Sequence, residues 1–502
     1  MQKIKKILIA NRGEIALRVM HSAKEMGITT VAIFSEADKN SPHVRYAHEA
    51  ICVGPPPSVE SYLNGEKIIE ACKQTGADAI HPGYGFLSEN TDFVRKVIEA
   101  NLIFIGPSPE SMEVMGNKLA AKEAVSKYNI PIIPGSENLI STLKEAKVMA
   151  IEIGYPVLIK ASAGGGGKGM RVVWKEAHLA EGLQRTTSEA AKAFGDGAVF
   201  LEKFIEFNKH IEFQILGDQH GNVIHLFERE CSIQRRHQKI IEEAPSAALN
   251  AELRQEMGQA AINVAKSCSY YGAGTVEFIF DQNNNYYFLE MNTRLQVEHP
   301  VTEAITGLDL VKEQIKIAEG RKLDIRQENL HIAGHAIEVR VYAEDPSNDF
   351  LPDIGKLKRY RRPQGPGVRV DDGIEEGMEI SIYYDPMIAK LIVLAKNRKE
   401  AINRMTKAIE DYEISGIETT LDFCKFVINH KVFINGTFNT RFVEEYFSPE
   451  KIDSSSQAGT AELKVAAVVA SRLLKKHQLR HMTDWDRHDF SKWRLRSKNY
   501  QK

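Results

Sequence analysis

The sequence predicts an α/β protein that continues into α+β segments and is divided into several domains. With 502 residues, the chain is too long for one ordinary hydrophobic core. Its first hundred residues alternate short apolar strands with helical spacing, which is typical of a parallel sheet. Later segments place two strands on either side of a turn sequence, once at residues 218–221 and once at residues 281–285, which indicates antiparallel hairpins.

The N-terminal segment, residues 1–115, is expected to form a βαβ-type domain. A strand at residues 7–10 precedes a helix from Glu14 to Met26, and a second strand follows at residues 29–34. The first turn, residues 11–14, contains only one glycine. The dinucleotide fingerprint needs several glycines in this turn, which argues against NAD binding and a dehydrogenase.

The second segment, residues 116–330, contains a glycine run at residues 163–169 that follows a strand ending in Lys160. Consecutive glycines let backbone N–H groups approach phosphates closely. A strand follows the run where the Rossmann motif has a helix, and Gly169 stands where a P-loop needs Ser or Thr. We interpret the run as a flap that closes over a nucleotide; a flexible linker is the alternative.

The same segment carries a hairpin with acidic side chains. Strands at residues 274–280 and 286–292 flank the turn 281–285, so Glu277 is expected opposite, or nearly opposite, Glu290. Asn292 and Arg294 share the face of Glu290, with Phe288 below them in the same row. Two carboxylates and an amide oxygen suit a hard cation such as Mg2+. The alternative is a solvated polar strand face.

Cationic groups gather shortly before this hairpin, flanked by glutamates at 228, 230, 242 and 243. Such a mixed network suits an anion held beside a metal-bound triphosphate, whereas a solvated charge run is the alternative. The cationic or potentially cationic residues are Arg235, Arg236, His237 and Lys239.

Residues 331–447 are expected to form a smaller mixed domain. Its strand at residues 334–343 alternates apolar and polar residues, so we expect it to be half-buried with Arg340 on the polar face. The remaining segment, residues 448–502, reads as a linker followed by a helical, basic tail with Trp485 and Trp493. It is either a solvated end or a docking surface for a partner subunit.

The composition argues against several classes of protein, among them nucleic-acid-binding, membrane and disulfide-rich proteins. A net charge of −2 offers no overall attraction to nucleic acid or to a membrane surface. The five cysteines show no metal-binding or disulfide spacing, which fits reduced thiols in the cytoplasm. We expect no signal peptide and no membrane span, because a strand opens the chain and no apolar run is long enough.

Several motifs together resemble the biotin carboxylases, enzymes of the ATP-grasp superfamily. The resemblance runs in order from residue 5 to about 445 and is carried by residues 9–16, 81–90, 115–118, 160–169, 234–239 and 290–302. It implies a three-part architecture: an N-terminal domain, a central ATP-grasp domain with a glycine flap, and a C-terminal mixed domain.

The resemblance also implies roles for individual residues. Metal positions correspond to Glu277, Glu290 and Asn292. The bicarbonate site corresponds to Lys239, Arg294 and the backbone of Val297, with Glu298 as the base, while Arg340 holds biotin and stabilises its anion. The expected ATP-binding residues are Lys118, Lys160, Gly166, Gly167, Glu202, Lys203, Phe204, Ile205, His210, Gln234, His237, Glu277 and Glu290.

The implied reaction is ATP-dependent carboxylation of biotin with bicarbonate through carboxyphosphate, with two Mg2+ or Mn2+ ions. None of the thirteen Met residues is followed by Lys, as carrier domains require, so the biotin is expected on a separate carrier protein. A carboxyltransferase subunit and a homodimer are the other expected partners. The alternative function is that of another bicarbonate-activating ATP-grasp ligase, and a non-catalytic ATP-binding scaffold is the rival of a different class.

Overall fold

The computed structural model describes residues 3–136, 138–162, 169–450 and 468–472. The chain separates into two compact units, Met1–Phe447 and Ser448–Lys502. Within the second unit, residues 468–472 form a short helical stretch. The flap glycines Gly166 and Gly167 lie outside the described residues, and so does most of the basic tail.

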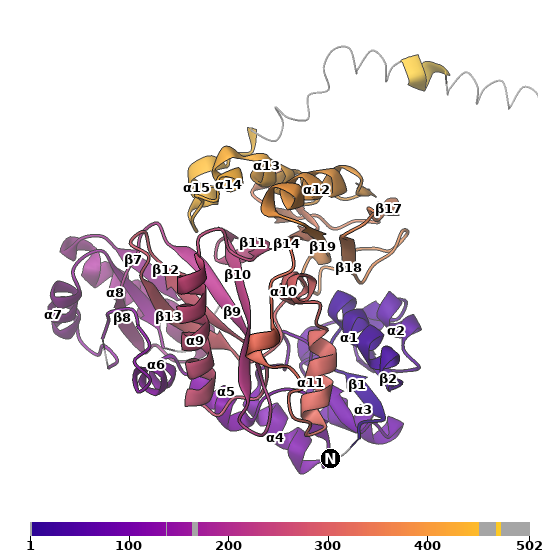
Figure 1. Ribbon diagram of the computed structural model, residues 1–502, viewed down its shortest axis with the longest axis horizontal. Coiled ribbons are helices and arrows are strands. Elements are labelled where there is room, and N and C mark those ends of the chain that lie inside the picture. The colour runs from indigo at the N-terminus through magenta and orange to yellow at the C-terminus, as the bar shows by residue number, and fades with distance from the viewer. Residues whose placement is uncertain (1–2, 137, 163–168, 451–467, 473–502) are drawn as a thin grey trace, which may run out of the picture. The chain divides into compact units, whose positions relative to one another are not determined.

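A five-stranded sheet at the N-terminus confirms the predicted parallel arrangement. Its order is β3-β2-β1-β4-β5, and every pairing is parallel. The strands are β1 (Lys6–Ile9), β2 (Thr29–Ser35), β3 (Glu49–Gly54), β4 (Ala79–His81) and β5 (Ile103–Phe104). The accompanying helices are α1 (Gly13–Glu25), α2 (Pro42–Tyr46), α3 (Gly65–Thr75) and α4 (Thr91–Glu99) (Figure 1).

A small three-stranded sheet follows helices α5 (Pro109–Gly116) and α6 (Lys118–Ser126). Its order is β7-β6-β8, with both pairings antiparallel. The strands are β6 (Val157–Ala161), β7 (Met170–Val173) and β8 (Val199–Lys203), and they pack with α7 (Leu143–Ile153) and α8 (Leu179–Phe194). Thr142 begins α7 with a capping box, in which its side chain and that of Glu145 satisfy each other's backbone N–H groups.

An eight-stranded antiparallel sheet forms the centre of the first unit, in the order β13-β12-β9-β10-β11-β14-β19-β18. Its strands are β9 (Lys209–Gly217), β10 (Val223–Arg235), β11 (Gln238–Ala244), β12 (Gly272–Phe280), β13 (Tyr286–Asn292), β14 (His335–Tyr342), β18 (Val368–Asp372) and β19 (Met387–Ala395). The hairpins predicted around residues 218–221 and 281–285 are therefore present, and one continuous sheet contains strands from both sides of residue 330.

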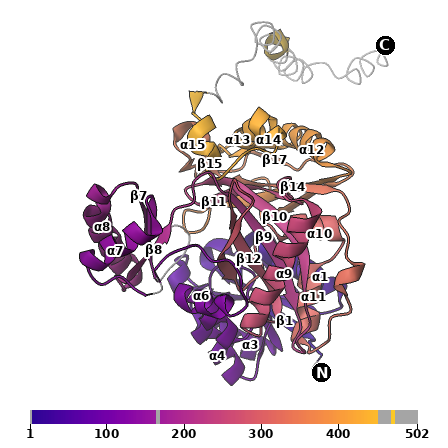
Figure 2. The same ribbon diagram turned by 60° about the vertical axis from the view of Figure 1, so that its left-hand side comes forward.

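Helices cover this sheet. Figure 2 shows α9 (Ala251–Ser267) along β9, β10 and β12, which it contacts. Helix α10 (His299–Thr306) packs on β10, β11, β14 and β19. Helix α11 (Leu310–Ala318) contacts both α1 and β12. The remaining elements are β15 (Glu344–Asp345), β16 (Leu351–Pro352), β17 (Arg359–Arg361), β20 (Glu413–Ser415), α12 (Arg398–Glu410), α13 (Leu421–Asn429), α14 (Lys431–Ile434) and α15 (Phe442–Tyr446).

One hydrophobic cluster connects the N-terminal sheet to the central sheet. Ile7 and Ile9 of β1 belong to the same buried cluster as Leu216 of β9, Ala273 of β12 and Leu310 of α11. Burial of this shared apolar surface stabilises the junction, because it removes both sheets from water at the same place. This junction keeps the loop after β4 close to the end of β13, where Glu89 of the loop contacts Arg294.

Two sequence expectations are wrong in detail. The strand around Arg340 is not half-buried, because β14 lies inside the eight-stranded sheet and all eight of its residues are buried. Phe288 does not share the row of Glu290: the register shifts between the pairs Glu277–Glu290 and Phe278–Phe288. This β-bulge turns Phe288 to the opposite face, into the core.

Candidate active site

The β12–β13 hairpin brings its acidic residues together as predicted. Glu277 and Glu290 are cross-strand partners. Asn292, two residues further along β13, donates from Nδ2 to Oε1 of Glu277 at 2.9 Å. The period-2 pattern of the strand therefore places all three oxygen-bearing side chains at one end of the hairpin.

These residues fit a divalent cation. Burial raises the pKa of Glu290, and the negative charge of Glu277 raises it further. Glu290 makes no hydrogen bond or ion pair with another described residue, so its carboxylate lies near a like charge without a direct partner. A hard cation bound by oxygens would relieve this repulsion, which is the donor set that Mg2+ prefers.

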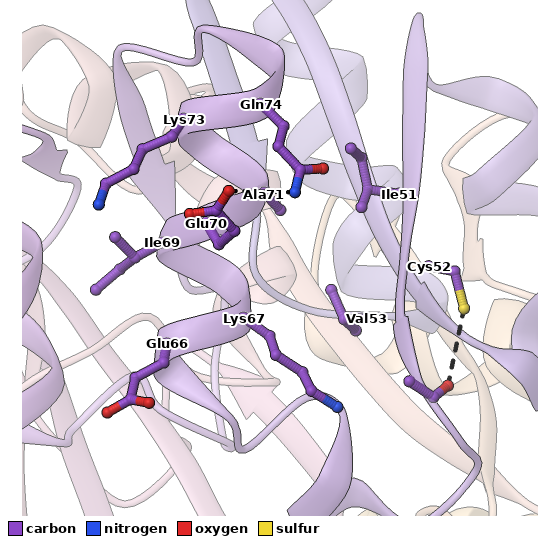
Figure 3. Close-up of a pocket in the computed structure, with 11 residues that line it drawn as sticks. Ile51, Cys52, Val53, Glu66, Lys67, Ile69, Glu70, Ala71, Lys73 and Gln74 are labelled. Carbon is purple, nitrogen blue, oxygen red and sulfur yellow. Dashed lines mark hydrogen bonds between the residues drawn. The ribbon is translucent and has the colours of Figure 1, made fainter.

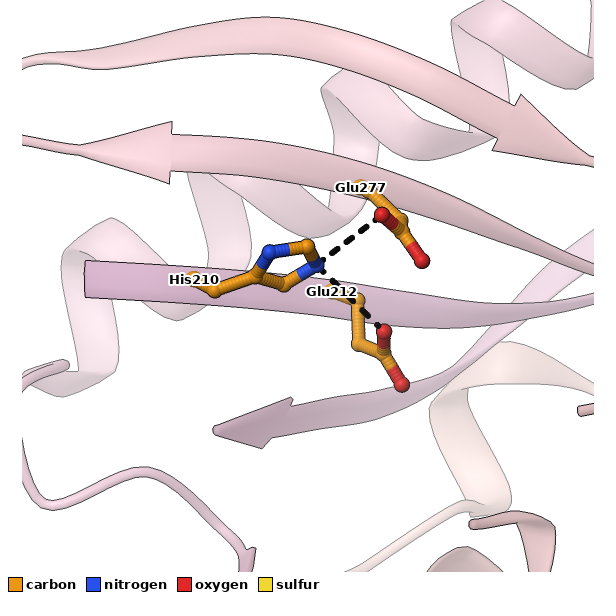
Figure 4. A group of neighbouring side chains, drawn as sticks. All are labelled: His210, Glu212 and Glu277. Atoms are coloured by element: carbon orange, nitrogen blue, oxygen red, sulfur yellow. Dashed lines mark ion pairs between the residues drawn. The ribbon is translucent and has the colours of Figure 1, made fainter. Parts of the chain in front are cut away.

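A second acidic group lies beside the first and includes one of its members. Ligand atoms of His210, Glu212 and Glu277 all lie within 4.8 Å of one another (Figure 4). Nε2 of His210 is 3.0 Å from Oε2 of Glu277 and 3.8 Å from Oε2 of Glu212. Both oxygens of Glu212 already bind cations, from Arg229 and Lys239. Glu290 is therefore the better second carboxylate for a metal.

Lys239 of β11 is the centre of the ionic network. Its Nζ lies 2.5 Å from Oε2 of Glu212, 2.9 Å from Oε1 of Glu277 and 2.8 Å from Oε1 of Glu298. Burial would lower the pKa of Lys239, but the three carboxylates outweigh it and hold the pKa well above its ordinary value. The ammonium group is therefore charged, with all three protons donated.

Glu298 is held by two cations at once. Lys239 binds Oε1, and Nη2 of Arg340 donates to Oε2 at 2.9 Å. Burial would raise the pKa of Glu298, yet the charges of Lys239, Arg340 and Arg229 overcome it and lower the pKa below its usual range. Glu298 is thus an ionised carboxylate that is almost fully buried. Arg340 also donates from Nε to Oε1 of Glu242 at 2.6 Å.

Arg294 lies beyond the end of β13. Its guanidinium is oriented by Asn292 of the central sheet and by Glu89 of the N-terminal segment. Nη2 donates to Oδ1 of Asn292 at 2.9 Å, and Nε donates to Oε2 of Glu89 at 2.8 Å. Glu89 also accepts from the backbone N–H of Thr293 at 3.0 Å. Sequence reasoning missed Glu89 as a site residue, although it lies within the 81–90 motif that supported the resemblance.

Arg229 is another residue that the sequence analysis missed. It is fully buried, and its guanidinium binds Glu212 at 2.5 Å through Nε. Its other donors contact Gln214, Thr302, Thr275 and Gln296 at 2.7–3.0 Å. Gln296 in turn donates to Glu277 at 2.8 Å. Arg229 therefore fixes the carboxylates beneath the site.

The expected phosphate-binding lysines lie side by side. The pKa of Lys118 is lowered by burial and then by the charge of Lys160. Lys160 pairs with Oε2 of Glu202 at 2.7 Å, and Lys122 pairs with the other oxygen. Three neighbouring ammonium groups around the single carboxylate of Glu202 leave positive charge for an anion such as a phosphate.

The expected nucleoside-contacting residues divide into two sets. Lys203 donates to the carbonyls of Gly154 and Tyr155, both at 3.0 Å, and so anchors the chain within its own sheet. Phe204 packs edge-on against Trp174, and Ile205 accepts from Asn208. In the second set, Gln234 binds the carbonyl of Cys231 at 2.8 Å, and His237 forms the exposed β10–β11 turn with a positive φ of 66°.

The backbone of Val297 is also held in place. Its carbonyl accepts from Nζ of Lys390 at 2.9 Å, and Lys390 lies 3.2 Å from Oε2 of Glu14. Glu14 also accepts a hydrogen bond from Tyr84. A residue of α1 and a residue of the 81–90 motif thus fix the loop that carries Arg294, Val297 and Glu298.

A surface hollow of about 740 Å³ lies between β3 and α3 (Figure 3). Its lining includes Val53, Lys67 and Gln74, with the exposed Cys52 at one side. It contains none of the residues expected in the active site. No helix in the described ranges is long and apolar enough to cross a membrane.

Family models match most of the chain. The N-terminal domain of biotin carboxylase matches residues 3–112, and its C-terminal domain matches residues 338–445. Between them, residues 117–326 match the ATP binding domain of the carbamoyl-phosphate synthase L chain. The two flanking models separate this chain from other ATP-grasp ligases.

Individual relatives agree with the family models. Biotin carboxylase 1 of Bacillus subtilis is 54% identical over 444 residues, which cover 88% of this chain and 99% of the relative. The chain belongs to the biotin carboxylase family. Human mitochondrial propionyl-CoA carboxylase alpha chain is 50% identical over 95% of this chain, which spans only 65% of that longer relative.

Solved biotin carboxylases have the same fold. The enzyme from Campylobacter jejuni, solved as a complex with a β-γ-ATP ligand, has a TM-score of 0.87 and 48% identity over 88% of this chain and 99% of its own. The biotin carboxylase domain dimer of Hydrogenobacter thermophilus 2-oxoglutarate carboxylase has a TM-score of 0.86 and 50% identity over 89% of this chain and 98% of its own. That structure was solved in complex with MgADP, ADP and bicarbonate. The expected ATP-dependent ligase of the biotin carboxylase type is thereby confirmed.

Proposed function

We propose that this chain performs the first half-reaction of a multi-subunit biotin-dependent carboxylase. It uses ATP and bicarbonate to carboxylate biotin that is presented by a separate carrier protein. One observation supports this assignment most strongly. Glu298 is a buried, ionised carboxylate whose two oxygens are held by different cations, Lys239 and Arg340. The two cations keep Glu298 ionised, so that it can accept a proton, and they stabilise an anion that develops beside it.

Divalent cations fit beside Glu277 and Glu290, with Asn292 as a further oxygen donor. We propose Mg2+ or Mn2+ at this position, two ions in all, together with the triphosphate of ATP. When bound, these ions supply Lewis-acid stabilisation of the transferring phosphoryl group. Lys118 and Lys160 hold the phosphates, since their ammonium groups face the same region as Glu290.

The remaining steps belong to the side chains around Glu298. Lys239 and Arg294 bind bicarbonate, and Glu298 accepts its proton. The deprotonated bicarbonate then attacks the γ-phosphate of ATP, and the bond to the bridging β-phosphate oxygen breaks. Carboxyphosphate and ADP form, with the developing charge spread over the surrounding cations. Carboxyphosphate releases CO2, and the phosphate accepts the ureido N–H proton of biotin. The ureido nitrogen then attacks CO2, which forms the C–N bond of carboxybiotin. Arg340 stabilises the negative charge on the ureido oxygen, because its guanidinium is oriented by Glu242 and Glu298.

We further propose a biotin carrier protein, a carboxyltransferase subunit and a second copy of this chain as partners. All five cysteines are free thiols, and none of them pairs with another, which supports the cytoplasm as the compartment. The acyl acceptor is selected by the transferase and is not encoded in this site.

Steady-state ATP hydrolysis tests the proposal. The purified chain should hydrolyse ATP slowly, in a reaction that needs bicarbonate, and free biotin should raise the rate. An ATPase that needs bicarbonate but does not respond to biotin would instead favour another bicarbonate-activating ligase. Hydrolysis independent of bicarbonate would contradict both.

A matched pair of variants sharpens this test. Arg294→Ala removes a proposed bicarbonate contact and should lower turnover by about 100-fold or more. Arg185→Ala is the control, because Arg185 lies in an exposed ion pair with Glu181 on α8, at 2.5 Å. Undiminished turnover of Arg294→Ala would count against the assignment.

A further inference from the structure

Glu338 is a buried carboxylate that the proposed reaction does not use. It lies on β14, two residues before Arg340, and its exposed fraction is 0%. Neither of its oxygens has a hydrogen-bond partner among the described residues. An ionised carboxylate without a hydrogen-bond partner is strongly destabilising at a buried position. Glu338 therefore needs a partner or must be neutral.

The cations nearest to Glu338 are bound to other groups. Arg340 uses Nε for Glu242 and Nη2 for Glu298. Lys390, the cross-strand partner of Arg340, pairs with Glu14 and donates to the carbonyl of Val297. No ion pair therefore joins Glu338 to either of these cations.

The opposite side of Glu338 is apolar. Its partner on β19 is Ile392, and Ala336 is the next residue on the same face of β14. Both belong to a buried cluster with Val301 and Ile305 of α10, the helix that packs on this part of the sheet. An apolar environment favours the neutral form of a carboxyl group.

Glu242 supplies the complementary acceptor. It is the direct cross-strand partner of Glu338 on β11 and is also 0% exposed. Its Oε1 accepts from Arg340, while its Oε2 has no partner among the described residues. Directly paired residues on antiparallel strands have neighbouring side chains. One proton between the two carboxyl groups would give Oε2 of Glu242 a donor and one oxygen of Glu338 a partner.

We propose that Glu338 is a positioning residue that carries this proton and donates it to Oε2 of Glu242, which fixes Glu242 beneath Arg340. Burial raises the pKa of both carboxyl groups, that of Glu242 to about 7 and that of Glu338 well above its ordinary value. Glu242 can then hold the guanidinium in one orientation for the biotin anion. This role rests on the proposed function of Arg340, whereas the protonation of Glu338 does not.

Two substitutions of Glu338 test whether its side chain acts as a neutral hydrogen-bond donor. Glu338→Gln keeps a donor at the same place, since its amide N–H reaches Glu242, and should leave kcat/KM for free biotin within about twofold. Glu338→Leu removes the donor and should lower kcat/KM for biotin about tenfold or more, while bicarbonate-dependent ATP hydrolysis without biotin is retained. Equal losses in both variants, or no loss in Glu338→Leu, would overturn the proposal.

A second measurement does not depend on activity. The infrared difference spectrum at neutral pH between wild type and Glu338→Gln should show loss of a protonated carboxylic acid carbonyl band. Glu243→Gln is the control: Glu243 is equally buried on β11, but it is ion-paired with His335 at 2.9 Å and Arg398 at 2.8 Å. Absence of a protonated acid band at Glu338 would overturn the inference even if the chain proves fully active with biotin.

Discussion

Glu89 accepts a hydrogen bond from Nε of Arg294 at 2.8 Å, although 205 positions separate the two residues in the sequence. Glu89 comes from the loop after β4, and Arg294 follows β13. The N-terminal sheet therefore orients a side chain at the end of the central sheet. This contact explains why the N-terminal part of the chain belongs to the active site.

Replacing Glu89 tests this relationship. Glu89→Gln should raise KM for bicarbonate several-fold with little change in kcat, because Arg294 keeps its charge but loses a charged partner. Initial rates of ATP hydrolysis over a bicarbonate series provide the measurement. Glu66→Gln is the matched control, since Glu66 pairs with Lys96 on an exposed surface. An unchanged KM would show that Glu89 does not position Arg294.

Loss of the proposed base should affect chemistry more than binding. In Glu298→Gln, Lys239 and Arg340 each lose one of their carboxylate partners, and bicarbonate loses its proton acceptor. We expect kcat to fall by about 100-fold to 10,000-fold, the usual range for a general base. Glu303→Gln is the control, because Glu303 is buried in α10 but pairs with Arg18 and Arg369. Similar losses in both variants would indicate a structural effect only.

Arg229 should contribute to stability more than any exposed arginine. Arg229→Met leaves Glu212 without one of its cations and leaves the acceptors at Gln214 and Gln296 unsatisfied. The expected loss is about 3–5 kcal/mol of unfolding free energy. Urea unfolding followed by circular dichroism measures it. Arg236→Met, at an exposed ion pair, should change stability by about 0.5 kcal/mol or less.

Burial of His43 predicts a pH-dependent loss of stability. Its side chain is fully buried, and burial lowers its pKa to about 4. The facing charges are Asp38, which opposes this shift, and Arg12, which adds to it. The unfolded chain takes up the proton near its ordinary pKa of 6.5, whereas the folded chain does so only near 4.

The stabilisation from neutral His43 is therefore complete above about pH 6.5 and declines as pH falls toward 4. In His43→Gln, the slope of unfolding free energy between these values should be shallower by about 1 kcal/mol per pH unit. Urea unfolding at half-unit pH steps gives both slopes. If the free energy of unfolding depended on pH equally in both proteins, His43 would not be the cause of the loss at low pH.

Truncation after Ser448 tests the tail as a docking segment. The first unit, Met1–Phe447, is compact by itself, and it contains every proposed catalytic residue. The truncated chain should therefore carboxylate free biotin at a rate within about twofold of the full chain. Its assembly with the carrier and transferase subunits should weaken, as measured by copurification. Unchanged assembly would refute a docking role.

The sequence by itself determined the local features of the site. The turn at residues 281–285 and the alternation on either side predict that Glu277 faces Glu290, and the register confirms it. The same logic placed Arg340 on a polar strand face and located the parallel sheet of the N-terminal segment. Period-2 and helical patterns depend only on residues that are close in sequence, so they can be recognised without knowledge of the tertiary structure.

The tertiary structure decided the rest. The bulge that turns Phe288 into the core depends on packing against Phe278, not on the residues of β13 alone. Burial of both faces of β14 follows from its place between β11 and β19. The pairing of Glu298 with Lys239 and Arg340 requires three distant segments to meet. Sheet order and long-range packing create these contacts and their charge balance, and no local sequence pattern encodes either of them.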